Sequence, residues 1–175
     1  MSSSSAKRLV RALRAQDEDA VHELVARAFG RPEEADLVRA LRGEVEPLLE
    51  LVAEAEGRIT GHIAFSPVIP ERVAPGVLAF GLGPMAVAPG LQRGGIGAEL
   101  VAAGLAACAA RGVGLVFVLG HPSYYPRFGF EPAAGRGFHY QSEAFDGAFF
   151  LRELAPGAAN GGGGLVQFAA PFDAV

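Results

Sequence analysis

Residues 87–98 read VAPGLQRGGIGA, which is the most informative stretch of the chain. An apolar segment of strand type precedes it, and a helical segment with few polar residues follows it. The first N–H groups of a helix lack partners within the helix, and the helix dipole attracts an anion to them. Gly94, Gly95 and Gly97 let the backbone approach a phosphate closely. The stretch predicts an anion-binding turn between a strand and a helix, and an ordinary glycine-rich turn is the alternative.

The segments on either side of this turn predict a βαβ unit. Residues 77–87 are expected to form a strand with a bulge or a missing neighbour at Gly83-Pro84, because proline cannot donate a ladder hydrogen bond. A helix is predicted over residues 95–111. The apolar run LVFVL at 115–119 is typical of a strand buried on both faces in a parallel pair. The crossover between the two strands should be right-handed.

The rest of the chain predicts further helices and strands around this unit. Apolar residues recur at helical spacing over 17–29, which predicts an amphipathic helix, and a second helix is expected over 33–42. Alternating residues over 59–66 predict a half-buried strand in a hairpin with 48–53. Residues 67–76 are expected to form a loop. Other strands are expected at 9–13, 149–154 and 165–168.

Two other nucleotide-binding motifs fit the sequence poorly. The chain contains no Gly-Lys-Ser or Gly-Lys-Thr, so a Walker A loop is absent. The letters GLGPMA at 81–86 match G-x-G-x-x-A, but they lie inside a predicted strand. A dinucleotide site needs a turn from a strand to a helix. We therefore reject both motifs.

Length, charge and cysteine content limit the functional classes. The 175 residues fit one domain, and the net charge of −4 argues against a nucleic-acid partner. No apolar stretch reaches the roughly 18 residues of a membrane span, and the start lacks a signal-peptide pattern. We expect no membrane partner and a cytoplasmic location. Cys108 is the one cysteine, which excludes an intramolecular disulfide, and its place on an apolar helix face favours an unreactive thiol.

Two motifs resemble the GNAT acetyltransferase superfamily. Residues 92–97, QRGGIG, resemble its Q/R-x-x-G-x-G/A signature, and residues 125–130, YPRFGF, resemble its Y-x-x-x-G-F segment. The wider run LGHPSYYPRFGF at 119–130 is similar to a bacterial subgroup called YhbS-like. The specific resemblance covers residues 77–131, where both motifs lie at the right separation.

The resemblance implies a particular fold. It is an α/β (α+β) fold with one acetyltransferase-like domain over residues 1–175, whose cofactor-binding core is about 77–131. The expected sheet is mixed and mostly antiparallel, with helices on its flanks. A central parallel strand pair is splayed at one end, and the interruption at Gly83-Pro84 suits that splay.

The resemblance also implies acetyl-CoA as the co-substrate. In this family the glycine-rich loop cradles the pyrophosphate of coenzyme A, and the amides of pantetheine pair with a strand edge as a short peptide would. The backbone groups of Met85 and Val87 match the pantetheine contacts. The loop residues implied to bind the cofactor are Gln92, Arg93, Gly94, Gly95, Ile96, Gly97 and Ala98.

Tyr125 is the first candidate for catalysis. It matches the family position where many members carry a tyrosine that protonates the coenzyme A thiolate. A phenol and an alkyl thiol titrate in adjacent ranges, so proton transfer between them is nearly balanced once both are shielded from water. Tyr124 is the fallback if Tyr125 only packs against the sheet.

Two histidines lie near the expected splay. His121 follows the strand at 115–119, where many family members carry an asparagine, and it is a candidate base, substrate contact or turn residue. His62 alternates onto the polar face of its strand, which predicts either a surface residue or a side chain in the acceptor pocket. The four histidines are scattered without metal-ligand spacing, so no metal is expected.

The expected function is direct transfer of an acetyl group from acetyl-CoA to a primary amine. The alternative is a non-catalytic acyl-CoA-binding sensor or regulatory domain on the same fold. A small-molecule or peptide amine is the expected acceptor, and the sequence does not specify which. A homodimer, the general base and the use of other acyl groups stay open.

Overall fold

The computed structural model describes residues 7–175 and is built around a seven-stranded sheet. The strand order is β1-β2-β3-β5-β6-β9-β7, in which β5 and β6 are parallel and the other neighbours are antiparallel. This arrangement confirms the predicted mixed, mostly antiparallel sheet. The strands are β1 (Arg8–Ala12), β2 (Leu49–Ala55), β3 (Arg58–Pro67), β5 (Leu78–Val87), β6 (Val113–Leu119), β7 (Glu131–Pro132) and β9 (Phe149–Glu153).

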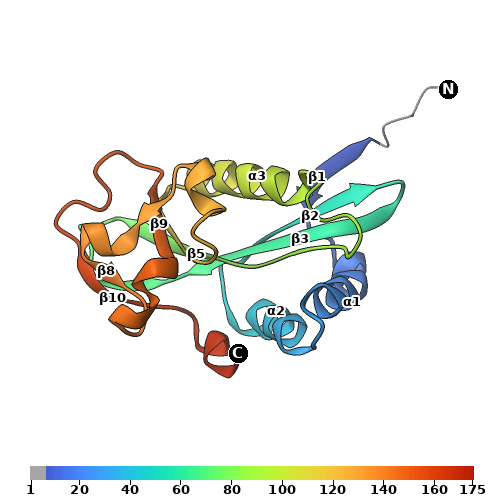
Figure 1. The fold of residues 1–175 in the computed structure, drawn as a ribbon, viewed down its shortest axis with the longest axis horizontal. Coiled ribbons are helices and arrows are strands. Elements are labelled where there is room, and N and C mark those ends of the chain that lie inside the picture. Colours follow the sequence, from blue (N-terminus) through green and yellow to red (C-terminus); the bar gives the residue numbers. More distant parts are fainter. Residues whose placement is uncertain (1–6) are drawn as a thin grey trace.

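Helices cover both faces of this sheet (Figure 1). On one face lies α3 (Ile96–Ala110), and on the other lie α1 (Glu18–Phe29) and α2 (Glu33–Glu44). All three predicted helices are confirmed. Short 3-10 turns complete the chain: η1 (Ala15–Asp17), η2 (Tyr125–Phe128), η3 (Ala133–Arg136), η4 (Glu143–Ala148) and η5 (Ala170–Ala174). No helix within residues 7–175 has the length and apolar character that crossing a membrane requires.

The parallel pair separates at one end, as predicted. β5 pairs with β6 only as far as Leu82 and Val118. On its other side, β5 stays paired with β3 up to Val87. The last residues of β5 therefore have β3 on one side and an open edge on the other. Because β5 and β6 are joined through α3, this open edge lies next to the start of that helix.

A bulge in β5 accompanies the separation. Ile63 of β3 pairs with Met85, whereas Phe65 pairs with Leu82, so three steps along β5 match two along β3. The extra residue falls at Gly83-Pro84, where the sequence predicted an interruption. A bulge bends its strand, which turns the end of β5 away from β6.

β3 is buried on both faces, so the prediction of a half-buried strand is wrong. Its polar residue His62 lies under α1 and α2 with no exposed surface, and the interpretation of His62 as a surface residue is also wrong. Nε2 of His62 and Nη2 of Arg42 each lie 2.8 Å from Oε1 of Glu50. Burial raises the pKa of Glu50, but hydrogen bonds from His62 and Arg42 outweigh it and hold the pKa below its usual value.

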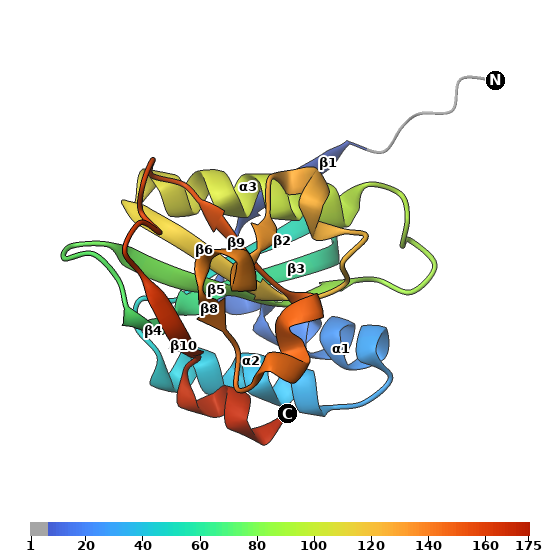
Figure 2. The same ribbon diagram turned by 60° about the vertical axis from the view of Figure 1, so that its left-hand side comes forward.

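A second, three-stranded sheet was not predicted. It consists of β4 (Ile69–Arg72), β10 (Gly163–Gln167) and β8 (Phe138–His139), in the order β4-β10-β8 (Figure 2). The expected loop over 67–76 therefore contains a strand, and the last strand pairs outside the main sheet. Aromatic side chains pack the two sheets together. Phe117 of β6 lies edge-on against Phe138 of β8, with 5.2 Å between the ring centroids.

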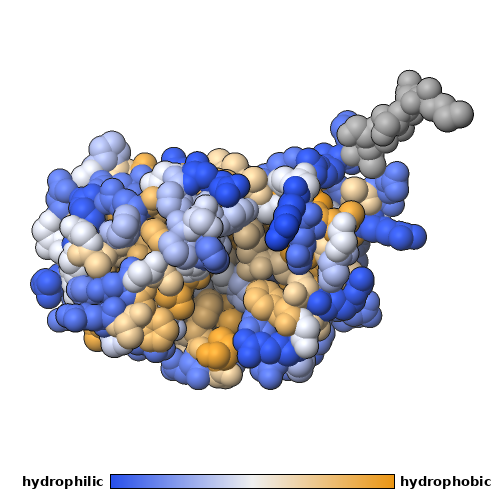
Figure 3. All heavy atoms as spheres, viewed as in Figure 1, coloured by the Kyte–Doolittle hydropathy of each residue, from blue (hydrophilic) through white to orange (hydrophobic). Residues whose placement is uncertain are grey.

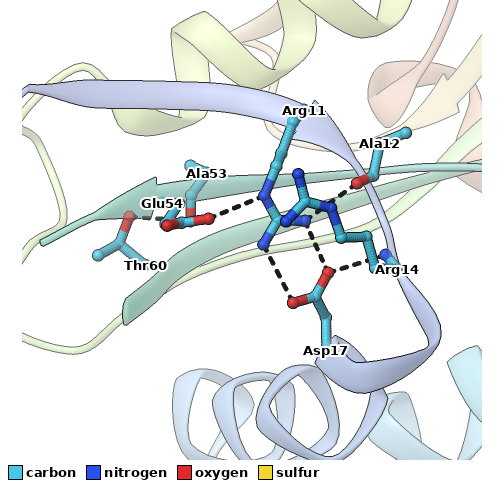
Figure 4. A network of polar contacts seen from close by, with 7 residues as sticks. All are labelled: Arg11, Ala12, Arg14, Asp17, Ala53, Glu54 and Thr60. Carbon is cyan, nitrogen blue, oxygen red and sulfur yellow. Dashed lines mark hydrogen bonds and ion pairs between the residues drawn. The ribbon is translucent and has the colours of Figure 1, made fainter. Parts of the chain in front are cut away.

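A buried ionic network fixes the entry into α1 (Figure 4). Arg11 of β1 donates to both carboxylate oxygens of Asp17, at 2.7 and 3.0 Å, and to Glu54 of β2 at 2.8 Å. The backbone N–H of Arg14 also donates to Asp17, at 2.8 Å. The hydrogen bonds from Arg11 lower the pKa of Asp17 against the opposing effect of burial. The network ties the first helix to the sheet edge.

Candidate active site

The glycine-rich loop runs from the end of β5 into the start of α3. Gly95 is the N-cap of α3, with a φ of 90° that favours glycine, and within residues 7–175 no side chain caps this helix end. The first helical hydrogen bond runs from the N–H of Glu99 to the carbonyl of Gly95. The N–H groups of residues 96–98 therefore have no partner within the helix, and they form an anion-binding end.

A cavity of about 590 Å³ opens at this helix end. It lies over the open edge of β5, and η2 supplies part of its wall. The residues that line it are Met85, Val87, Gln92, Arg93, Gly95, Gly97, Ala98, Tyr124 and Arg127. Two of the loop residues singled out from the sequence do not line it: Gly94 turns its carbonyl toward Arg8, and the Ile96 side chain is buried in the core. Arg93 and Arg127 give the cavity a positive charge that suits a pyrophosphate.

The open edge of β5 presents backbone groups to this cavity. The N–H of Ala88 donates to the carbonyl of Thr60 in β3, and Ala86 pairs with His62. Because hydrogen-bonding directions alternate along a strand, Met85 and Val87 direct their backbone groups the other way, toward the splay. Only one side-chain contact reaches this edge within residues 7–175, a 3.4 Å bond from Gln92 to the carbonyl of Val87.

Arg8 supports the loop from outside, a role that was not predicted. Its Nη1 donates to the carbonyl of Gly94 at 2.7 Å, and its Nη2 pairs with Glu99 at 2.7 Å. Arg8 thus orients the loop and compensates a carboxylate in the first turn of α3, which would otherwise repel an anion. The contact spans 86 positions in the chain, so no local pattern could have revealed it.

The two neighbouring tyrosines face different cavities. Tyr124 lines the cavity at the glycine-rich loop, where its ring stacks with Arg127 at 4.7 Å. Tyr125 lines a second cavity, of about 350 Å³, on the other side of the splay. Their rings meet edge-on at 5.1 Å between centroids. Met85 lines both cavities, so the cavities adjoin at this residue and this pair of rings.

Burial changes the acidity of Tyr125. Only 8% of the residue is exposed, and this burial raises the pKa of Tyr125 to about 12, with a further contribution from Tyr124. The hydroxyl is therefore protonated throughout the neutral range. An ordinary alkyl thiol has a pKa near 8.5. The difference between this value and the pKa of Tyr125 is larger than expected from the sequence, which predicted nearly equal pKa values for the two groups. A thiolate buried in the same place would narrow the gap, because burial raises thiol pKa values too.

Most of the residues that line the second cavity are apolar. It lies between α2, the bulge of β5 and the C-terminal turn η5, where Figure 3 shows hydrophobic side chains gathered beside a hollow. Its lining is Phe29, Glu34, Leu37, Leu82, Gly83, Pro84, Met85, Leu119, Tyr125, Tyr140, Phe168, Phe172 and Val175. Glu34 supplies the charged side chain of this lining. No role was predicted for Glu34, because acidic residues are ordinary in the first turn of a helix.

Comparison with known proteins identifies the family. A family model described as an acetyltransferase (GNAT) domain matches residues 9–133. The chain belongs to the GNAT acetyltransferase family. It is 34% identical to the uncharacterized N-acetyltransferase YhbS of Escherichia coli, over 90% of this chain and 93% of YhbS. It is also 41% identical to the uncharacterized N-acetyltransferase YjhQ of Escherichia coli, over 68% of this chain and 67% of YjhQ.

Two solved GNAT structures resemble the whole chain. The structure of YhbS from Escherichia coli in complex with CoA has a TM-score of 0.89 and 32% identity, covering 99% of this chain and 96% of that one. A GNAT family acetyltransferase from Brucella melitensis in complex with acetyl-CoA has a TM-score of 0.78 and 32% identity, covering 96% of this chain and 99% of that one. Both likenesses confirm the predicted GNAT fold.

His121, which lies close to where many GNAT members carry an asparagine with a longer spacing to the tyrosine, is in an exposed turn. Its Nδ1 lies 2.8 Å from the hydroxyl of Ser123 and accepts the backbone N–H of the same residue at 3.2 Å. It lines neither of the two cavities at the splay. These contacts favour the turn interpretation, so His121 has no part in the mechanism proposed below. His62, buried against Glu50, does not line them either.

Proposed function

We propose that this GNAT protein transfers an acetyl group from acetyl-CoA directly to a primary amine. The observation that carries the proposal is the meeting of two cavities at Met85 and at the rings of Tyr124 and Tyr125. One cavity has the unpartnered helix end and cationic side chains that a pyrophosphate requires. The other is lined mostly by apolar residues and is of a size that suits a small organic acceptor.

The residues divide the work of binding between them. The N–H groups of residues 96–98, with Arg93 and Arg127, bind the pyrophosphate. The remaining loop residues form the surface on which it lies. The backbone groups of Met85 and Val87 on the open edge pair with the pantetheine amides as a neighbouring strand would, and the long bond from Gln92 to the carbonyl of Val87 gives way to the ligand. Residues 77–131 form this cofactor-binding core within one domain over residues 1–175. The thioester is thereby placed at the junction of the cavities.

Tyr125 acts as the general acid at that junction. The amine nitrogen forms a bond to the thioester carbonyl carbon, the carbon–sulfur bond breaks, and the departing thiolate takes the phenolic proton. The amine loses one proton to solvent, and Tyr125 regains its own from solvent. The buried position of Tyr125 keeps its hydroxyl protonated, as an acid must be. An acyl-CoA sensor would have no need of a protonated phenol facing an acceptor cavity.

Two measurements test this function. Calorimetry measures the binding of CoA and acetyl-CoA, and we expect a dissociation constant well below the millimolar range. Incubation of acetyl-CoA with a set of primary amines, followed by thiol release and by the mass of the acetylated product, measures transfer. Binding of CoA without any acetylated amine would favour the sensor instead, and the absence of CoA binding would contradict both functions.

A further inference from the structure

The cavity beside Tyr125 has an aromatic wall on the side away from the cofactor. Tyr140 and Phe168 meet edge-on at 5.4 Å, and Phe168 and Phe172 meet at 5.3 Å. These rings come from the last part of the chain, outside the cofactor-binding core, and η5 brings Phe172 beside α2 (Figure 2). Leu37 and Leu82 extend the apolar lining toward the sheet. Such a lining binds the body of an apolar ligand and offers little to a polar one.

Glu34 stands alone as a charged side chain on this lining. It is 8% exposed, and its carboxylate accepts the Nε of Arg31 at 3.1 and 3.0 Å as well as a contact from Nη2. Arg31 itself is 55% exposed at its side chain, so it approaches Glu34 from the solvent side. A carboxylate offers about four acceptor positions. The guanidinium leaves room for a further N–H donor from the cavity.

We propose that the acceptor is a small primary amine on an apolar aryl or alkyl body. The Tyr140–Phe168–Phe172 wall binds the body, and Glu34 accepts a hydrogen bond from the amino group and directs it toward Tyr125. This inference rests on the proposed acetyl transfer. Glu34 is a specificity residue, because it attracts the amine and takes no proton in the reaction. At about 350 Å³ the cavity suits one ring or a short chain.

The side chains around the wall disfavour acceptors with several amino groups. Apart from Glu34, the side chains that line the cavity are uncharged, so a second ammonium would lie mainly against leucine and phenylalanine side chains. The carboxylates of Glu71 and Asp173 line a separate cavity of about 440 Å³, which shares Tyr140, Phe168 and Phe172 with this one. The aromatic wall stands between these carboxylates and Glu34.

Calorimetry on the full chain saturated with CoA tests the inference. The probes are phenethylamine, hexylamine, 1,4-diaminobutane and glucosamine, and the same four are assayed for acetylation. We expect phenethylamine and hexylamine to bind at least about tenfold more tightly than the other two. Equal or tighter binding of 1,4-diaminobutane or glucosamine would overturn the inference, even if these amines are acetylated. Tight binding of the apolar amines without acetylation would instead overturn the proposed transfer.

Matched variants separate recognition from a structural role. Glu34→Gln keeps the shape and removes the charge, so phenethylamine should bind at least about tenfold more weakly while CoA affinity stays unchanged. Arg31→Gln removes the partner but leaves the carboxylate, and its phenethylamine affinity should stay within about threefold of native. Equal losses in the two variants would mean that Glu34 only anchors Arg31. Phe172→Ala should weaken phenethylamine at least about fivefold and methylamine hardly at all; equal losses would remove the aromatic wall from the site.

Discussion

The hydroxyl of Tyr124 lies 2.9 Å from the point that a Cβ at Gly97 would occupy. Tyr124, the residue before η2, and the first turn of α3 thus lie against each other at the cavity beside the glycine-rich loop. Outside the helix's own backbone and the chain neighbours of Gly97, the next heavy atoms of the described residues are those of Met85 at 3.7 Å and Val87 at 3.8 Å. Glycine at this position lets the phenol pack directly over the helix end.

We expect Gly97→Ala to weaken CoA binding about tenfold, because the added methyl group displaces Tyr124 into the cavity. Overpacking of this kind costs about 1 to 3 kcal/mol. The double variant Gly97→Ala with Tyr124→Phe lacks the colliding hydroxyl and should recover most of the affinity relative to Tyr124→Phe alone. Calorimetric titration of the four proteins measures the effect. Additive losses without recovery would show that the contact does not shape the site.

Arg8→Ala should weaken CoA binding by about 2- to 5-fold. It frees the Gly94 carbonyl and leaves Glu99 uncompensated beside the pyrophosphate, and exposed charge effects of this kind are worth about 0.5 to 1 kcal/mol. Adding Glu99→Gln to Arg8→Ala removes the repulsion and should restore part of the loss. The effect should shrink at high salt, because exposed charges are screened. A loss that persists in the double variant at high salt would assign Arg8 to loop geometry alone.

Asp17→Asn should lower the free energy of unfolding by about 1.5 to 3 kcal/mol at pH 7, since Arg11 then loses a buried charged partner. The folded pKa of Asp17 is depressed, so its stabilising contribution is present above its unfolded pKa, near 3.9, and is lost as pH falls through the folded pKa. The difference between native and variant should vanish in strong acid. Urea unfolding at several pH values measures it.

Asp19→Asn is the matched control for this network, because Asp19 is exposed in the same helical turn. We expect it to change the unfolding free energy by less than about 0.5 kcal/mol. A difference for Asp17→Asn that stays constant from pH 7 to strong acid would contradict the ionic role of this residue.

Patterns within the chain were sufficient to predict the unit formed by β5, the glycine-rich turn, α3 and β6. The apolar run at 115–119 indicates a strand and the glycines at 94, 95 and 97 indicate a turn. Neither inference requires knowledge of distant contacts. The interruption at Gly83-Pro84 likewise indicated the bulge in β5. These features fixed the order of strands and helix on which the site is built.

The remaining site depends on contacts between distant segments. β4 was missed because its four residues are too short to show an alternating pattern, and its partner β10 lies some ninety positions away. Arg8 and Glu34 look like ordinary surface residues of a strand and a helix until the fold brings them to the loop and the cavity. His62 was assigned to a polar face, whereas α1 and α2 cover that face and make it core.

The measurement that tests the account most directly is the kinetics of Tyr125→Phe with an acetylated amine. Removing the hydroxyl keeps the ring packing, so acetyl-CoA affinity should stay nearly unchanged while the rate of single-turnover transfer falls at least about tenfold. Tyr124→Phe should lose less, and because the pKa of Tyr125 is about 12, native activity should not decline below pH 10 through this group. A single-turnover rate for Tyr125→Phe equal to that of the native protein would contradict the mechanism, and a larger loss at Tyr124 would assign the acid to the other ring.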